Sequence, residues 1–298
     1  MKKISILLAL LLAACAPAGP RTLTVMTHDS FAASESVVAA FEQANNVRVQ
    51  FLKAGDAGAA LNKAILAKDA PLADVFYGLD NTFLSRALAA GIFEPYAAPA
   101  LAQIPVEFKL DPTNAALPVD YGDVCLNYDK AYFADHSLAP PQTLEELTLP
   151  AYRGLLVVEN PAASSTGLAF LLATVARFGP DGFAGYWAQL RANDVKVVDG
   201  WETAYYTDFS GSSGRGPRPL VVSYASSPPA EVIFGDPKPA EAPTASVVGP
   251  GACFRQIEFV GILKGTPNRA LAEKWVDFML AAQFQAERHV VDHAPVRQ

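Results

Sequence analysis

The feature that most constrains the fold is the alternation of strand-like and helix-like segments near the start of the chain. Residues 23–27, 47–51 and 73–79 have the apolar or period-two pattern of strands. Apolar residues at helical spacing follow each of these strands. A helix with Ser34 as its expected N-cap follows the first strand, and the helical segments 57–68 and 81–90 follow the other two. Strands that alternate with helices in this way predict a mostly parallel sheet with helices on its faces.

A second series of such segments begins after Pro118. Its strand-like segments are 124–128, 155–158, 195–198, 220–224 and 254–263. Its helix-like segments are 167–178, a stretch after Trp201, and 268–284. With 298 residues, of which 51% are hydrophobic, the chain is long enough for two α/β domains or one large one. The sequence therefore predicts an α/β fold.

The N-terminus carries the pattern of an export signal. Two lysines precede an apolar run at residues 4–12, and a pair of small residues then precedes Cys15. This order resembles a bacterial lipoprotein signal, in which the cysteine is lipidated and becomes the mature N-terminus. The alternative is a plain signal peptide with an incidental cysteine. We expect residues 1–14 to be a signal peptide, Cys15 the lipid anchor and residues 15–21 a tether.

The remaining composition agrees with an exported protein. No other stretch is apolar and long enough to cross a bilayer, so we expect a lipid-anchored protein in the periplasm or on the outer face of the cytoplasmic membrane. The net charge of −7 argues against nucleic acid as a partner. In an exported protein Cys125 and Cys253 are expected to be paired rather than free.

Polar residues follow the predicted strands at the edge of the sheet where ligands bind in folds of this class. In the first series they are His28-Asp29-Ser30, Gly55-Asp56 and Asp80-Asn81. In the second series they are residues 160–166, Gly200-Trp201 and residues 225–229. Two α/β units whose loops face a common cleft, in an exported lipoprotein, predict a solute-binding protein.

Several motifs resemble the periplasmic thiamine-binding proteins of ATP-driven importers. They are "LTVMTHDSF" (23–31), "DVFYGLDN" (74–81), "VDYGDVCLNYDK" (119–130), "NPAASSTGL" (160–168), "GWETAY" (200–205) and "LVVSYASSP" (220–228). The resemblance implies a two-lobed type II binding-protein fold, related to that of ferric-iron-binding proteins, with a ligand cleft between lobes joined by crossing strands. It places residues 22–118 and 255–298 in one lobe and residues 119–254 in the other. It also implies a monomer, without cofactor or bound metal, that delivers its solute to a membrane permease.

The family's cleft positions carry over to polar and aromatic residues of this chain. The candidate ligand-binding residues are Asp29, Ser30, Asp56, Asp80, Tyr121, Ser164, Ser165, Thr166, Gly167, Trp201, Tyr224 and Ser227. Carboxylates and aromatic faces suit the thiazolium cation of thiamine, and a helix start suits its hydroxyethyl group or a phosphate. Each residue also has an ordinary structural alternative, because serines and aspartates commonly cap helices and a tryptophan commonly packs in a core.

Two further expectations come from the resemblance. The crossing strands of this fold run side by side, which predicts a Cys125–Cys253 disulfide at the hinge. The family often has a tyrosine where this chain has Ala230, and an aromatic segment and a helical tail near the C-terminus that are not recognisable in this sequence. In their place, Phe31, Phe254 or Tyr121 is a candidate to stack on the ligand.

Three other functions compete with this interpretation. A ferric-iron binder of the same fold uses two adjacent tyrosines where this chain has Tyr224-Ala225. His289 and His293 have the spacing of metal ligands on a helix, but no third ligand is nearby in the sequence. A binder of polyamines or another organic cation would use the same residue types. An enzyme acting on a small cationic substrate is disfavoured, because the chain has no GxSxG, GxGxxG or P-loop motif.

Overall fold

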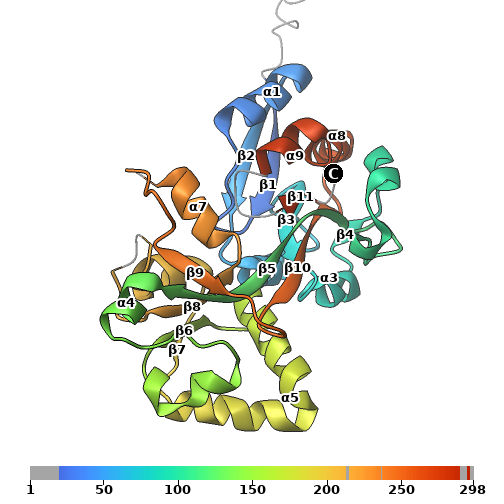
Figure 1. Cartoon of the computed structure of the whole chain (residues 1–298). Helices are drawn as coiled ribbons and strands as arrows, with labels where there is room; N and C mark the ends of the chain where they lie inside the picture. The colour runs from blue at the N-terminus through green and yellow to red at the C-terminus, as the bar shows by residue number, and fades with distance from the viewer. Residues whose placement is uncertain (1–19, 213–214, 236, 289–293, 296–298) are drawn as a thin grey trace, which may run out of the picture.

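The computed structural model describes residues 20–212, 215–235, 237–288 and 294–295, and Figure 1 shows its arrangement. The strands form a continuous sheet in the order β2-β1-β3-β10-β5-β8-β6-β7, with β4, β9 and β11 paired off this path. We call the body built on β1, β2 and β3 the first lobe, and the body built on β6, β7 and β8 the second lobe. No helix within the described ranges is long and apolar enough to cross a membrane. Residues 1–19, with the expected signal and Cys15, lie outside them.

The first lobe follows the predicted alternation of strands and helices. β1 pairs in parallel with both β2 and β3. Helix α1 begins after Ser34, as predicted, although the Ser34 hydroxyl contacts Ser36 rather than a backbone amide. Helix α3 is shorter than predicted, because residues 81–83 form a turn after β3. The elements are β1 Arg21–Thr27, α1 Glu35–Asn45, β2 Val47–Lys53, α2 Ala57–Leu66, β3 Val75–Asp80, α3 Leu84–Ala90 and β4 Phe93–Glu94, followed by the short helices η1 Pro99–Gln103 and η2 Val106–Phe108.

The second lobe contains more helix than the sequence pattern indicated. Helix α5 extends to Ala192, past the predicted end, because the chain turns at Gly179 (φ 74°) before Pro180 and then continues as a helix. The short helix α7 and the strand β9 were not predicted. The elements are α4 Lys130–Asp135, η3 Glu145–Thr148, η4 Pro150–Tyr152, β6 Leu156–Glu159, α5 Ser165–Ala192, β7 Lys196–Val198, α6 Trp201–Thr203, η5 Ala204–Asp208, β8 Leu220–Tyr224, α7 Ser227–Phe234 and β9 Thr244–Val247.

Two long antiparallel strands cross between the lobes (Figure 1). They are β5 Leu117–Asp129 and β10 Phe254–Leu263. β5 pairs with β10 along its first part and with β8 and β9 along its last part, so it belongs to the sheets of both lobes. The short strand β11 Ala294–Pro295 pairs with β5 beside Tyr121 and Asp120.

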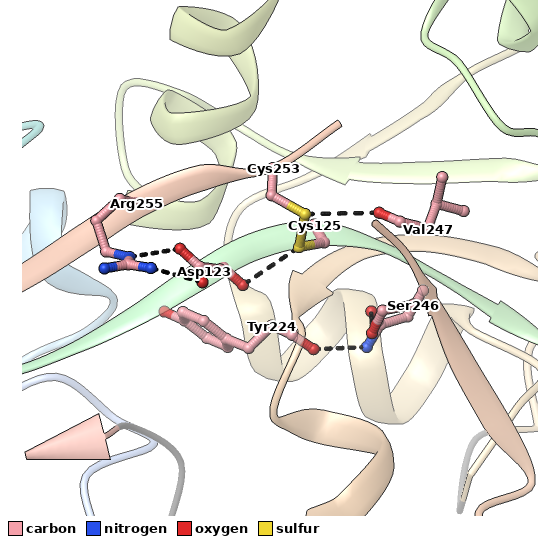
Figure 2. Close-up of a disulfide and its surroundings, with 8 residues drawn as sticks. Asp123, Cys125, Tyr224, Ser246, Val247, Cys253 and Arg255 are labelled. Carbon is pink, nitrogen blue, oxygen red and sulfur yellow. Dashed lines mark hydrogen bonds and ion pairs between the residues drawn. A yellow bond between two sulfur atoms is a disulfide. The ribbon is translucent and has the colours of Figure 1, made fainter. Parts of the chain in front are cut away.

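The predicted Cys125–Cys253 disulfide is confirmed, and it lies where the crossing strands meet the second lobe (Figure 2). Cys125 is in β5, and Cys253 directly precedes β10, with the two Cα atoms 4.4 Å apart. Beside the bridge, the Arg255 guanidinium binds both carboxylate oxygens of Asp123 (Figure 2). The disulfide therefore joins the two crossing strands at the hinge.

Each lobe has its own hydrophobic core. Residues of the first three strands, of β10 and of the C-terminal helices build the first-lobe cores, and residues of β5, β6, β8 and α5 build the largest core of the second lobe. The predicted helix over 268–284 is broken into α8 Arg269–Met279 and α9 Ala282–Arg288. Trp275 of α8 is fully buried against Phe41, with ring centroids 4.9 Å apart.

Candidate functional site

The C-terminal end of β3 places a buried carboxyl between the lobes. Asp80 is fully buried, and its Oδ1 atom accepts a hydrogen bond from the Thr82 backbone N–H at 2.7 Å. The Ser165 hydroxyl, at the start of α5 in the other lobe, lies close enough to this carboxyl to lower its pKa. Burial nevertheless raises the pKa of Asp80, and the hydrogen bonds from Thr82 also oppose this rise. Asp80 therefore stabilises its own turn and also faces the second lobe.

Asp56 joins the lobes more directly. It is the N-cap of α2, and its Oδ1 atom accepts a hydrogen bond from the Ala57 N–H at 2.7 Å. Its Oδ2 atom accepts a hydrogen bond from the backbone N–H of Trp201 in the second lobe at 3.0 Å, and the Ser164 hydroxyl is a further partner. Burial raises the pKa of the Asp56 carboxyl against the effect of these hydrogen bonds.

The start of α5 supplies the hydroxyl groups that face these carboxyls. Ser164, Ser165 and Thr166 are all buried, and the Ser164 and Thr166 hydroxyl oxygens lie 3.0 Å apart. A Cβ atom on Gly167 would lie 2.4 Å from the Glu159 carbonyl oxygen, so the end of β6 and the start of α5 pack in close contact. These hydroxyls lie close enough to three carboxyls to lower their pKa values, and two of the carboxyls, those of Asp56 and Asp80, belong to the first lobe.

Trp201 lies at the centre of an aromatic cluster in the second lobe. Its side chain is 9% exposed and stacks on Tyr205, with ring centroids 5.0 Å apart and planes inclined by 18°. The indole N–H donates to the Ser223 hydroxyl at 2.9 Å, and the Ser223 and Ser227 hydroxyl oxygens lie 3.0 Å apart. Ser227 therefore supports Trp201 through Ser223. The indole thus packs in the second-lobe cluster, while the backbone N–H of the same residue binds Asp56.

Tyr224 lies between this cluster and the carboxyls. Its ring centroid is 6.2 Å from that of Trp201, and its hydroxyl donates to the Gln256 side chain at 3.4 Å. Burial raises the pKa of the Tyr224 phenol well above its ordinary value, and the carboxyls of Glu258, Asp56 and Asp80 add to this rise. The phenol is thus close to acidic groups from the first lobe and from the crossing strand β10.

Two candidates, Ser30 and Tyr121, lie outside this group of contacts, and Asp29 lies at its edge, where its charge adds to the rise in the pKa of Asp56. Asp29 accepts a hydrogen bond from the Gly55 N–H at 2.8 Å and so holds the loop that follows β2. The Ser30 hydroxyl lies 2.9 Å from His28 Nδ1. Tyr121 stacks on Phe108, with ring centroids 4.9 Å apart, while the Arg255 guanidinium lies 4.7 Å from its ring centroid.

Among the proposed substitute aromatics, Phe31 is 5% exposed and packs in the first-lobe core against Phe51 and Tyr77. Phe254 is only partly buried, against the core of the second lobe. Trp201, through its backbone N–H, and Tyr224, through its phenol, are by contrast linked to the Asp56 carboxyl.

Sequence reasoning missed Glu159. It is the last residue of β6 and is fully buried, and the nearby Thr166 hydroxyl acts to lower its pKa. Burial raises the pKa of this carboxyl well above its ordinary value, and the neighbouring Asp56 adds to the rise. The rule that polar residues at strand ends form the site would have found Glu159, had the strand been extended by one residue.

Sequence reasoning also missed a buried polar group beneath the first lobe's loops. The Tyr77 hydroxyl lies 2.7 Å from both Asp120 Oδ2 and Glu258 Oε2, and His28 Nε2 lies 3.5 Å from Glu258 Oε1. The signal for Glu258 was an acidic residue inside the apolar run 257–263. In the described part of the chain, no group of three or more His, Cys, Asp or Glu side chains is arranged to hold a metal ion. His289 and His293 lie outside the described residues.

Replacing Glu159 by glutamine is expected to stabilise the protein at alkaline pH. Because the folded-state pKa of Glu159 is raised, its contribution to the free energy of unfolding is most favourable below the unfolded pKa of about 4.3 and is lost as pH rises through the folded pKa. The neutral amide avoids this loss, so Glu159→Gln should raise the free energy of unfolding at pH 8, by about 1.4 kcal/mol for each unit by which the folded-state pKa exceeds the unfolded one.

Urea unfolding at pH 4.5 and pH 8 measures this effect. The gain should be smaller at pH 4.5, where about 40% of the unfolded-state glutamate is already protonated. Glu107→Gln is the matched control, since Glu107 is exposed and the same substitution there should change little at either pH. An equal gain at the two pH values would contradict this assignment of the buried proton.

Comparisons with known proteins give the family. Residues 70–294 match the family model described as bacterial extracellular solute-binding protein. The chain is 31% identical over 284 residues to the thiamine-binding periplasmic protein of Salmonella typhimurium, an alignment that covers 93% of this chain and 82% of the relative. It is 29% identical over 274 residues to the protein of the same name from Brucella suis, covering 89% of this chain and 75% of the relative.

Solved structures agree on the fold. A periplasmic thiamin binding protein matches with a TM-score of 0.81 at 28% identity, covering 94% of this chain and 87% of the other. Iron-bound HitA from Pseudomonas aeruginosa matches with a TM-score of 0.73 at 17% identity, covering 94% and 87%, a likeness of fold alone. The two-lobed type II fold implied by the resemblance is thereby confirmed.

These matched proteins are binding proteins, and the role of this chain is to bind a solute rather than to catalyse a reaction. The carboxyls, hydroxyls and aromatic rings described above meet between the lobes, where proteins of this fold hold their ligand. The chain belongs to the family of bacterial extracellular solute-binding proteins.

Proposed function

We propose that the chain captures thiamine, or a thiamine phosphate, outside the cytoplasmic membrane and delivers it to the permease of an ABC importer. The observation that carries this proposal is the meeting of buried carboxyls and aromatic rings between the lobes, with Asp56 and Asp80 on one side and Trp201 and Tyr224 on the other. An organic cation suits this environment, because carboxylates and aromatic faces both attract positive charge. The names of the relatives at 29–31% identity support thiamine as that cation.

The cleft residues take different parts in this proposal. Asp80 and Tyr224 present polar atoms to the ligand, and the Trp201 ring supplies an aromatic wall supported by Ser223 and Ser227. The start of α5, from Ser164 to Gly167, and the loop residues Asp29 and Ser30 surround the cleft. Tyr121 lies beside it on a crossing strand.

The arrangement of the whole chain completes the proposal. Residues 1–14 direct export, Cys15 carries the lipid anchor and residues 15–21 tether the protein to the membrane, where it acts as a monomer. The lobes comprise residues 22–118 with 255–298, and residues 119–254. The polypeptide changes lobe along β5 and β10, which is why closure of the cleft bends these two strands.

Titration of the purified protein tests this function, with tryptophan fluorescence and calorimetry as readouts. Thiamine or its phosphates should bind at micromolar concentration or below, while spermidine and ferric citrate should bind far more weakly. The absence of any response to thiamine compounds would reject the proposal. Tighter binding of spermidine or ferric citrate would instead assign the cleft to a polyamine or to iron.

A further inference from the structure

The N-terminus of α2 makes backbone contacts across the cleft that the solute-binding role does not by itself require. The N–H groups of Gly58 and Ala59 both donate to the Ala163 carbonyl of the second lobe, at 2.9 and 3.2 Å. Two residues before Gly58, the Asp56 carboxylate accepts a hydrogen bond from the Trp201 N–H of the second lobe at 3.0 Å. We call these three hydrogen bonds, which join residues 56–59 to Ala163 and Trp201, the α2 seam.

Gly58 is the residue that permits this approach. A Cβ atom at this position would lie 2.8 Å from the Ala163 carbonyl oxygen and 2.9 Å from that of Ala162. These are backbone atoms of the other lobe, so they can move away only if the loop deforms or the lobes separate. A side chain at residue 58 would therefore oppose the contact between the lobes.

The second-lobe side of the seam is held rigidly. The Ala163 N–H donates to the Asn160 carbonyl at 3.0 Å, and the Ala162 N–H donates to the Asn160 side chain at 3.0 Å. The Asn160 N–H in turn donates to the Val198 carbonyl at 2.7 Å, two residues before the Gly200-Trp201 turn. One loop thus fixes both the Ala163 carbonyl and the strand that leads to Trp201.

We propose that the α2 seam is the closing contact of this binding protein, in which Gly58 allows the lobes to meet and Asp56 positions the Trp201 turn against the bound solute. This inference rests on the proposed function for the identity of the solute. Both carboxylate oxygens of Asp56 accept backbone N–H groups, so Asp56 acts as a positioning residue that links the start of α2 to the opposite lobe. The seam then sets how slowly the closed protein releases its ligand.

Gly58→Ala tests the seam, with Gly185→Ala as its matched control. Gly185 is an exposed residue of α5 with open space around the position of a Cβ atom. Stopped-flow fluorescence with thiamine should show at least tenfold faster release from Gly58→Ala and unchanged release from Gly185→Ala. Hydrogen exchange should show that the Trp201 amide is less protected in Gly58→Ala than in the wild type.

A second pair of variants separates the seam from packing within the first lobe, because a Cβ atom at residue 58 would also lie 2.7 Å from Phe83 Cζ. Phe83→Leu relieves that contact and leaves the contacts with the second lobe in place. Gly58→Ala/Phe83→Leu should still release thiamine at least tenfold faster than Phe83→Leu alone. Equal release rates for this pair would overturn the proposal.

The seam and the proposed function can fail independently. If the wild type does not bind thiamine, the proposed function is rejected, and the seam is judged by exchange of the Trp201 amide without ligand. Slower exchange in the wild type than in Gly58→Ala then supports the seam. Equal exchange in the two proteins overturns it.

Discussion

Removal of the Cys125–Cys253 bridge is expected to lower the free energy of unfolding by about 5 kcal/mol. The two cysteines are 128 positions apart, so the bridge closes a very long loop in the unfolded chain. In the chain-entropy description, a loop of that length corresponds to about 5 kcal/mol of lost unfolded-state entropy at 25 °C. Urea unfolding of Cys125→Ser/Cys253→Ser against the bridged protein measures the difference, with Cys15→Ser present in both to remove the third thiol.

The folded state should survive this change. β5 and β10 remain paired from Val124 and Phe254 down to Leu117 and Val260, and Arg255 still binds Asp123 beside the former bridge. The bridged protein treated with a reductant is the control, and its unfolding midpoint should fall to that of the double variant. A loss below about 1 kcal/mol would show that the unfolded chain is already compact around these residues.

The positions of several strands were accessible to sequence reasoning for a physical reason. Strands buried on both faces are short, nearly continuous apolar runs, so β3 and β8 stand out against the helices that separate them. The disulfide was predictable only because the resemblance placed both cysteines on crossing strands. The break of α5 at Gly179 was not predicted, because helical periodicity resumes after Pro180 and one glycine conformation decides the path.

No local sequence pattern could have predicted the contacts between the lobes. Asp56 meets Trp201 across 145 positions of sequence, and Ser165 meets Asp80 from the opposite lobe. Residue types at strand ends predicted that these groups face a cleft, but not which of them bind one another. Glu159 was missed for a different reason: the predicted strand ended one residue before it, so the rule for polar residues at strand ends was applied from Asn160 onward.

Trp201→Ala is expected to weaken thiamine binding by about 30-fold or more. A cation–π contact with a desolvated tryptophan contributes about 2 kcal/mol, which corresponds to about 30-fold in the dissociation constant. Alanine also removes the ring that stacks on Tyr205 and the indole N–H that binds Ser223, so the turn facing Asp56 loses its support. Calorimetric titration with thiamine at a temperature where the variant is fully folded measures the loss.

Trp187→Ala is the control that separates affinity from stability. Trp187 lies on α5, donates its indole N–H to Thr174 at 3.0 Å and packs edge-on against Phe170, with ring centroids 5.7 Å apart. Its loss should destabilise the second lobe but leave the dissociation constant within about twofold, since a core truncation changes the folded fraction and not the cleft. Trp201→Phe, which keeps an aromatic ring, should bind with intermediate affinity. If the two alanine variants weakened binding equally, Trp201 would be a core residue of the aromatic cluster, and the cation would have to bind elsewhere in the cleft, with Tyr224 as the next aromatic to replace.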